Sequence, residues 1–261
     1  MKIYNFMEVS ANFSLAPEAA VEHFQAKGLA LTFDWRDMLG EEHDAAVTVA
    51  KMMDIDLLST VRDKLDDHLA NGGTFGEFKK ALVPELKKAG WWGKKDLVDP
   101  LTGNVVEAQL GSASRLETIF RSNLQSSYSV GRWDMIQQNI DTAPFLMYDA
   151  VDDHRTRPAH AALDNIVLPA TSSFWNEFMP PNGYNCRCGV IQMDSDDLKE
   201  FGLSVSRTPI IKRETWLNPR TGKKHSIPEA IDPGWNNNPG KRRLERLKAL
   251  EKEKLDNATS S

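Results

Sequence analysis

Apolar residues recur at helical spacing over most of the first 140 positions. A stripe of apolar side chains at steps of three and four residues predicts a long helix from Glu42 to about Asn71. Thr74 and Glu77 then form a Thr-x-x-Glu capping box, which predicts the start of the next helix. Pro84 should bend or restart that second helix. Together the two segments predict a helical hairpin.

Two further helices complete this half of the chain. The segment 17–28 begins with Pro and ends with Gly, which is typical of a short capped helix. A second long helix is predicted from about Ser112 to Asn139. Between the helices, turn residues at Asp99-Pro100 and near Gly103-Asn104 predict a short β-hairpin or an exposed loop.

The pattern changes at Pro144. The segments PFLMYDAV and CGVIQM are apolar and read as buried strands, separated by a long irregular stretch. After Asp194 come one or two helical turns, a run of turns with little core, and the charged helix KRRLERLKALEKEKLD. We therefore predict an α+β fold with a helical part over 1–142, a small β-containing domain over 143–193, and an extended tail with a charged C-terminal helix over 194–261.

The charge balance limits the classes of partner. The 261 residues carry a formal net charge of -5, whereas a protein that coats DNA neutralises phosphates with an excess of Lys and Arg. A local DNA contact through Lys241, Arg242 and Arg243 stays open, and it would be sensitive to salt. No run of about 18 apolar residues occurs, so we expect no membrane partner.

The irregular stretch contains candidate metal ligands. His154 and His160 precede Cys186 and Cys188, and two imidazoles with two thiolates are a suitable tetrahedral set for zinc. The Cys-x-Cys spacing is tighter than that of ordinary zinc modules. The alternative is that the cysteines are partly buried small residues on either side of Arg187, and that His160 is hydrogen-bonded beneath the loop.

The same stretch carries a polar cluster with two interpretations. Arg offers a planar fork that a carboxylate accepts with both oxygens, so such pairs can hold an irregular loop in place. The same Asp and His residues could instead form a metal-dependent hydrolase or nuclease site. No recognised catalytic spacing accompanies them, which favours the structural interpretation. The cluster consists of Asp152, Asp153, His154, Arg155, Arg157, His160, Asp164 and Arg187.

A family resemblance rests on the order of these residues. The chain contains Asp-x-Arg-Thr-Arg-Pro-x-His, then Leu-Pro, Phe-Trp and Pro-Pro-Asn-Gly-Tyr-Asn-Cys-Arg-Cys. This order resembles the signature of the phage Mu F-like head morphogenesis family, and the resemblance extends over about residues 17–240. The motif residues are Asp153, Arg155, Arg157, His160, Pro180, Pro181, Asn182, Gly183, Cys186, Arg187 and Cys188.

The resemblance implies a minor head protein of a tailed phage or prophage rather than an enzyme. Its implied partners are the portal and capsid proteins of the phage head, with packaged DNA as a further candidate. Its implied location is the virion head, and the host cytoplasm during assembly. No cofactor is implied, and zinc stays open on the residues alone. His154 departs from the family pattern, which leaves His160, Cys186 and Cys188 as the better metal ligands.

Overall fold

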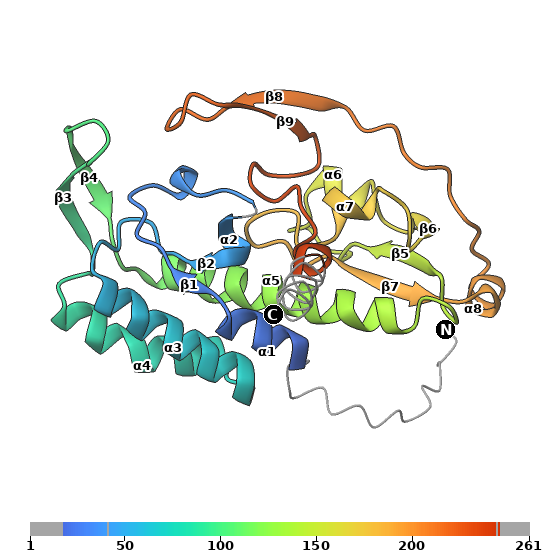
Figure 1. The fold of residues 1–261 in the computed structure, drawn as a ribbon, viewed down its shortest axis with the longest axis horizontal. Coiled ribbons are helices and arrows are strands. Elements are labelled where there is room, and N and C mark those ends of the chain that lie inside the picture. Colours follow the sequence, from blue (N-terminus) through green and yellow to red (C-terminus); the bar gives the residue numbers. More distant parts are fainter. Residues whose placement is uncertain (1–17, 41, 244, 246–261) are drawn as a thin grey trace, which may run out of the picture.

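One long helix runs along the axis of the molecule (Figure 1). The computed structural model describes residues 18–40, 42–243 and 245. Its helices are α1 (Glu18–Gln25), α2 (Glu42–Ala45), α3 (Ile55–Asn71), α4 (Phe75–Lys88), α5 (Ala113–Gln138), α6 (Pro158–Ala161), α7 (Trp175–Phe178) and α8 (Ser195–Glu200), with a 3₁₀ turn at Trp35–Asp37. Its strands are β1 (Gly28–Leu29), β2 (Ala46–Val47), β3 (Lys94–Val98), β4 (Val105–Gln109), β5 (Phe145–Asp149), β6 (Val167–Pro169), β7 (Gly189–Met193), β8 (Arg213–Leu217) and β9 (Lys224–Pro228). This mixture confirms the predicted α+β class.

Helix α5 is the long helix, and it forms where the sequence predicts it. The Ser112 hydroxyl caps its start by accepting a hydrogen bond from the backbone N–H of Arg115 at 3.2 Å. Its 26 residues correspond to a length of about 39 Å. The helix contributes to two separate cores, Leu116, Phe120 and Leu124 to the first and Trp133 and Ile136 to the second.

The first core lies between α5 and the predicted helical hairpin, but the hairpin is shorter than expected. Helix α3 begins at Ile55, so the prediction of one helix from Glu42 is wrong in its first part. Asp54 sets the true start by accepting two backbone hydrogen bonds from the first turn, at 3.0 and 3.1 Å. Lys51 has a φ of 68°, which a helix interior does not allow. Met52 lies in a loop, and its side chain is buried in the core. Its apolar side chain therefore fitted the helical pattern of the sequence although the residue is not helical.

Helix α4 begins at the predicted capping box. The backbone N–H of Thr74 donates to the Glu77 carboxylate at 2.8 Å, and the N–H of Glu77 donates to the Thr74 hydroxyl at 3.3 Å. The expected restart at Pro84 does not occur, because α4 continues through it to Lys88. Proline lacks the N–H that would bind the carbonyl of Lys80. Lys80 is exposed, so water can take the place of that hydrogen bond.

The second core is built on a three-stranded antiparallel sheet in the order β6-β5-β7. The structure confirms the two predicted strands as β5 and β7. Leu146 and Tyr148 of the central strand β5 are fully buried, and so is Trp175 of α7. The indole N–H of Trp175 donates to the carbonyl of Pro169 at 3.0 Å, which ties α7 to β6. The sequence did not predict β6, α6 or α7.

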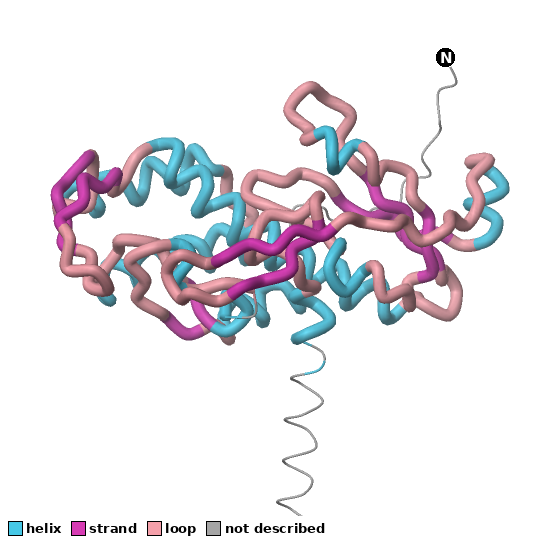
Figure 2. The backbone as a smooth tube through the Cα atoms, turned by 90° about the horizontal axis from the view of Figure 1, so that it is seen from above, coloured by secondary structure: helices cyan, strands magenta, loops and turns pink. Residues whose placement is uncertain are grey.

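The tail is more ordered than the sequence suggests. Helix α8 forms at the predicted helical turns, but the expected run of turns contains the antiparallel hairpin β8–β9. Trp216 of β8 stacks on Trp35 with ring centroids 6.0 Å apart, and the hairpin crosses one side of the molecule (Figures 1 and 2). Ala230 and Ile231 then join the second core. The predicted three-part division stays a prediction, and the structure adds that the tail packs on both other parts.

The predicted C-terminal helix lies mostly outside the described residues. The described part is helical over 239–243 and at Glu245. Of the two alternatives for the segment between α4 and α5, the hairpin β3–β4 forms, with Val98 opposite Val105, and it projects at one end of the molecule (Figure 1). Within the described part of the chain, no helix is long and apolar enough to cross a bilayer.

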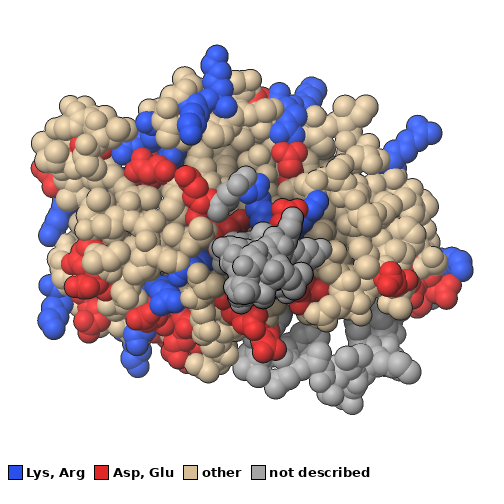
Figure 3. All heavy atoms as spheres, in the orientation of Figure 1, with Lys and Arg blue, Asp and Glu red and all other residues tan. Residues whose placement is uncertain are grey.

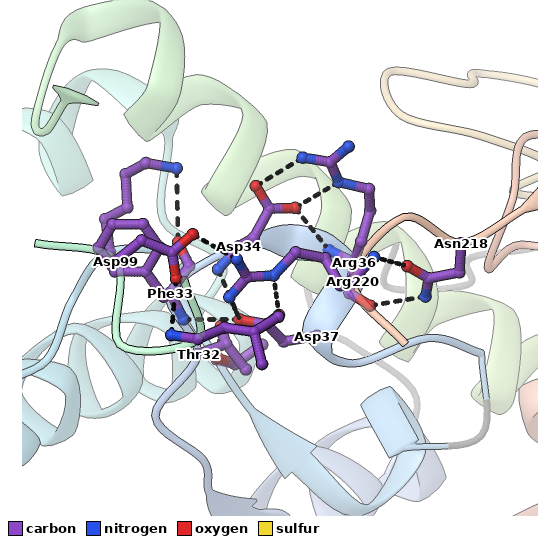
Figure 4. Close-up of polar contacts among 11 residues, drawn as sticks. Thr32, Phe33, Asp34, Arg36, Asp37, Asp99, Asn218 and Arg220 are labelled. Carbon is purple, nitrogen blue, oxygen red and sulfur yellow. Dashed lines mark hydrogen bonds and ion pairs between the residues drawn. The ribbon is translucent and has the colours of Figure 1, made fainter. Parts of the chain in front are cut away.

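Arg220 joins three segments that are distant in the sequence (Figure 4). Its guanidinium binds Asp37 at 2.6 Å and also pairs with Asp99 in the β3–β4 loop. The side chain of Arg220 is only 9% exposed. The neighbouring Asn218 donates to the carbonyl of Arg36 at 2.9 Å. This Arg220 cluster therefore fastens the tip of the tail hairpin to the first half of the chain.

We predict that Arg220→Met lowers the melting temperature by roughly 5–10 °C, because it leaves two carboxylates side by side without their counter-charge. Thermal unfolding followed by circular dichroism measures the change. Arg207→Met is the control, since Arg207 is an exposed arginine of the same tail. That variant should move the transition by less than about 2 °C. Equal melting temperatures for the two variants would contradict the role given to Arg220.

Candidate functional site

The loop between β5 and β7 carries the predicted site residues because its two ends meet in the sheet. Asp149 at the end of β5 pairs with Gly189 at the start of β7, so residues 150–188 leave and return at one edge. His160 lies in the short helix α6, which has Pro158 at its first position, where proline fits well. Cys188 directly precedes β7. The strand register therefore brings the histidine and the cysteine motif to one place.

A His–Cys–Cys cluster forms from His160, Cys186 and Cys188. The Nδ1 atom of His160 lies 3.7 Å from the Sγ atom of each cysteine, and the three possible ligand atoms all lie within 4.8 Å of one another. His160 is 3% exposed and Cys186 is 6% exposed, whereas Cys188 is half-buried. Both cysteines are free thiols. This arrangement has the residue types of a soft-metal site.

His154 is not part of this cluster. It is exposed, and the group of possible metal ligands found among the described residues consists of the other three alone. The fourth predicted zinc ligand is therefore not brought to the site. The physical reason is that His154 lies in the turn before α6, where Asp153 and Thr156 hold the backbone in a tight loop.

The two cysteines of the cluster differ in their electrostatics. Hydrogen bonding with Cys186, and then with His160, holds the pKa of the Cys188 thiol well below its usual range. The same contact with Cys188, together with burial, raises the pKa of Cys186. Burial also raises the pKa of the Tyr148 phenol. The two shifts are thus opposite in sign, and the lower pKa is that of Cys188, the more exposed of the two cysteines.

Arg187 and Asp153 of the predicted polar cluster form a two-point ion pair. Two guanidinium nitrogens of Arg187 lie 2.7 and 2.6 Å from the two carboxylate oxygens. This pair holds the pKa of Asp153 well below its usual range. The backbone N–H of Arg155 also donates to Asp153, at 2.9 Å. Asp153 is thus occupied by structural hydrogen bonds, which favours a loop-fixing role over that of a general base.

The Pro-Pro-Asn-Gly turn is anchored in the second core. The peptide bond between Pro180 and Pro181 is cis, and the hydroxyl of Ser129 in α5 donates to the carbonyl of Pro180 at 2.6 Å. Asn182 is fully buried. Its amide oxygen accepts a hydrogen bond from the Tyr148 hydroxyl at 2.8 Å. The turn therefore connects the long helix to the central strand of the sheet.

Arg157 forms an ion pair with Asp232 that passes close to Gly183. Arg157 pairs with Asp232 at 2.9 Å and donates to the carbonyl of Tyr184 at 3.0 Å. A Cβ atom on Gly183 would lie 2.3 Å from both the guanidinium and the Asp232 carboxylate. Glycine is therefore the residue that lets this ion pair cross the turn. The pair also attaches the returning tail to the motif loop, which is the segment 150–188 between β5 and β7.

The predicted nucleic-acid contacts lie away from this cluster, and all three residues interact with other groups of the chain. Lys241 donates to the side chain of Asn176 at 2.7 Å. Arg243 binds Glu22 at 2.7 Å and lies 4.0 Å from Asp134, and its side chain is 12% exposed. Arg242 is half-buried. A DNA contact by these residues stays a prediction, but it would have to compete with the internal contacts of Lys241 and Arg243.

Sequence reasoning missed a buried lysine beside a cavity of about 970 Å³. The Nζ atom of Lys27 donates to the carbonyl of His43 at 2.8 Å, and burial lowers the pKa of Lys27 to about 8. Trp35 and Trp216 are among the other residues that line the cavity. The sequence offers no signal, because Lys27 follows a helix end, where an exposed lysine is ordinary. Tyr148 and Asp232 were also missed as partners of the motif. Nothing in the sequence indicates that Tyr148 binds Asn182 or that Asp232 binds Arg157.

The observed features define an α+β protein built on a single long helix, with a motif loop that joins β5 to β7. No solved structure matches the chain. The model of the family described as Phage Mu protein F like protein matches residues 59–191, which includes α5, the motif loop and the His–Cys–Cys cluster. The chain belongs to this family, which confirms the resemblance found in its sequence.

Two curated relatives are similar to most of the chain. Protein F of Escherichia phage Mu, whose name assigns it provisionally to capsid assembly, is 43% identical over 192 residues, covering 74% of this chain and 44% of that protein. The Mu-like prophage FluMu F protein of Haemophilus influenzae is 38% identical over 177 residues, covering 67% of this chain and 41% of that protein. The chain thus spans less than half the length of these relatives.

We predict that Asn182→Ala destabilises the protein by about 1–3 kcal/mol, because it removes a buried acceptor from the Tyr148 hydroxyl. Denaturant unfolding measures the change. Tyr148→Phe should destabilise the Asn182→Ala variant less than it destabilises the wild type, because the shared hydrogen bond is already lost. Asn104→Ala, at an exposed amide of the β3–β4 loop, is the control and should stay within about 0.5 kcal/mol. Strictly additive effects at positions 148 and 182 would contradict the proposed coupling.

Proposed function

We propose that this chain is a minor component of a tailed-phage head and that it acts in head assembly at the portal vertex. The observation that carries the proposal is the 43% identity with protein F of phage Mu, a protein provisionally assigned to capsid assembly. The matched family region contains both α5 and the motif loop. The proposed partners are the portal and capsid proteins, and the proposed location is the phage head.

The arrangement of charged side chains supports a structural role. Asp153, Arg157 and Arg187 of the motif are each engaged in an ion pair within the chain, so Asp153 is held by Arg187 and is not free to act as a general base. We therefore expect the chain to work through contacts with other proteins rather than through catalysis. A hydrolase or nuclease that uses the His/Asp/Cys residues is the alternative that this pairing disfavours.

The surface gives limited support to the alternative of a DNA-binding accessory. Acidic and basic side chains are interspersed on the face shown in Figure 3 and do not form one broad basic field there. Strong general affinity for phosphates depends on such a field. The net charge of -5 points the same way. Contact with DNA inside the head would then be local and secondary to protein contacts.

The decisive experiment uses phage Mu deleted for protein F. A chimera of protein F, in which the matching region is replaced by that of this chain, is supplied in the infected cell. We expect the deletion to abolish normal heads and the chimera to restore at least about a tenth of the wild-type yield. Electron microscopy counts the heads. Cross-linking of purified heads, followed by mass spectrometry, should join the chimera to the portal protein.

Intact protein F is the positive control, and an empty vector is the negative control. Normal heads in the absence of any F protein would remove the basis of the assembly role. Restored heads in which the chimera is cross-linked all over the shell would keep the assembly role and contradict the portal location. Binding of the purified chain to DNA at physiological salt, lost in a Lys241→Ala/Arg242→Ala variant, would favour the DNA accessory instead.

A further inference from the structure

The imidazole of His160 lacks a strong hydrogen bond on both of its nitrogens. Its Nε2 atom is buried and has no hydrogen-bond partner among the described residues. The hydrogen-bond partners of its Nδ1 atom within the described part of the chain are the two sulfurs of Cys186 and Cys188, each at 3.7 Å. Sulfur is a weak partner for a ring nitrogen at such a distance. The distant sulfur contacts leave Nδ1 available to a stronger ligand, with the ring proton on Nε2.

The separations match those of ligands around zinc. Zinc binds histidine nitrogen at about 2.0–2.1 Å and thiolate sulfur at about 2.3 Å, so a tetrahedral site places nitrogen and sulfur about 3.6 Å apart. The two observed distances from Nδ1 of His160 to sulfur are both 3.7 Å. All three atoms lie within 4.8 Å of one another. The cluster therefore needs no rearrangement of its backbone to surround one ion.

We propose that Nδ1 of His160 and the Sγ atoms of Cys186 and Cys188 bind one zinc ion. The two thiols lose their protons as the ion binds, so the ion and its two thiolates are together neutral. Thiolate and imidazole ligands select zinc over magnesium and calcium, which prefer oxygen. Three protein ligands leave a fourth position, which a water molecule fills.

A cleft gives the ion a way in and space for that water. It has a volume of about 150 Å³, and its lining includes Cys186, Cys188, Arg132 and Arg187. Two arginines beside a cation would normally oppose binding. Here the charge of Arg187 is offset by Asp153 at 2.6 Å, and the charge of Arg132 interacts with the neighbouring carboxyl of Asp149. The charge around the cleft is thus compatible with a divalent cation bound by two thiolates.

The ion would join two parts of the motif loop. His160 belongs to α6, whereas both cysteines come directly before β7. A zinc ion there ties the far part of the loop to the sheet, so it strengthens the same connection that the pair of Arg187 and Asp153 makes on the surface. The ion acts as a structural tie between α6 and β7, and the site needs no partner protein.

The test is a cobalt titration of the full chain under reducing conditions after a chelator has removed bound metal. Cobalt replaces zinc in thiolate sites and gives a sulfur-to-metal band in the near ultraviolet. We expect this band to saturate at one cobalt per chain and to disappear when zinc is added. Elemental analysis of untreated protein should find about one zinc per chain. Zinc should also raise the melting temperature of the metal-free protein.

Cys188→Ser should weaken binding by more than about 100-fold, because loss of a ligand costs more than loss of an outer partner. His154→Ala is the control, since that histidine is exposed and outside the cluster, and it should bind cobalt as the wild type does. If Cys188→Ser fails to fold, alkylation of the wild type replaces it, and zinc should protect both thiols. Absence of the sulfur-to-cobalt band in the folded wild type would overturn the proposal. Loss of binding in His154→Ala would overturn the ligand set.

Discussion

Helix α5 is the constraint on which the rest of the structure depends, because both hydrophobic cores use its surface. Leu116, Phe120 and Leu124 belong to the first core, and Trp133 and Ile136 belong to the second. The two cores cannot move apart without breaking this helix. The returning tail adds a further contact, because a Cβ on Gly240 would lie 2.3 Å from the Cβ of Trp133. A substitution at the centre of α5 should therefore disturb the packing of the helical hairpin, the sheet and the tail together.

Hydrogen bonds from α5 and from strand β5 hold the motif loop in place. Ser129 of α5 binds the carbonyl of Pro180, and Tyr148 of β5 binds the side chain of Asn182. These contacts are buried, so each lost hydrogen bond would leave a polar group without water. The pair of Arg187 and Asp153 adds a partly buried contact to these two. The loop is long, but its shape is set by partners on every side.

Local signals in the sequence predicted the elements that depend on local contacts. The capping box of Thr74 and Glu77 and the periodicity of α5 each describe a structure that forms within a few turns. The β8–β9 hairpin and the Arg220 cluster were not predictable, because Trp216 and Arg220 find their partners more than a hundred residues away in the sequence. The same limit applies to the site. Residue type and order indicated the cluster, but only the fold separates His154 from it.

The way the loop is held also determines how a metal would act there. In a small zinc module the ligands come together only when the ion binds, so binding and folding are one event. Here Tyr148, Asn182 and Ser129 already position the loop around the cysteines through hydrogen bonds that involve no metal. Little ordering remains to oppose binding, which favours affinity. It follows that the metal-free chain keeps its fold, and that an ion at His160 adds stiffness to a site formed beforehand. A rigid loop of this kind is compatible with the proposed role in head assembly, in which the loop would keep its shape as a contact surface.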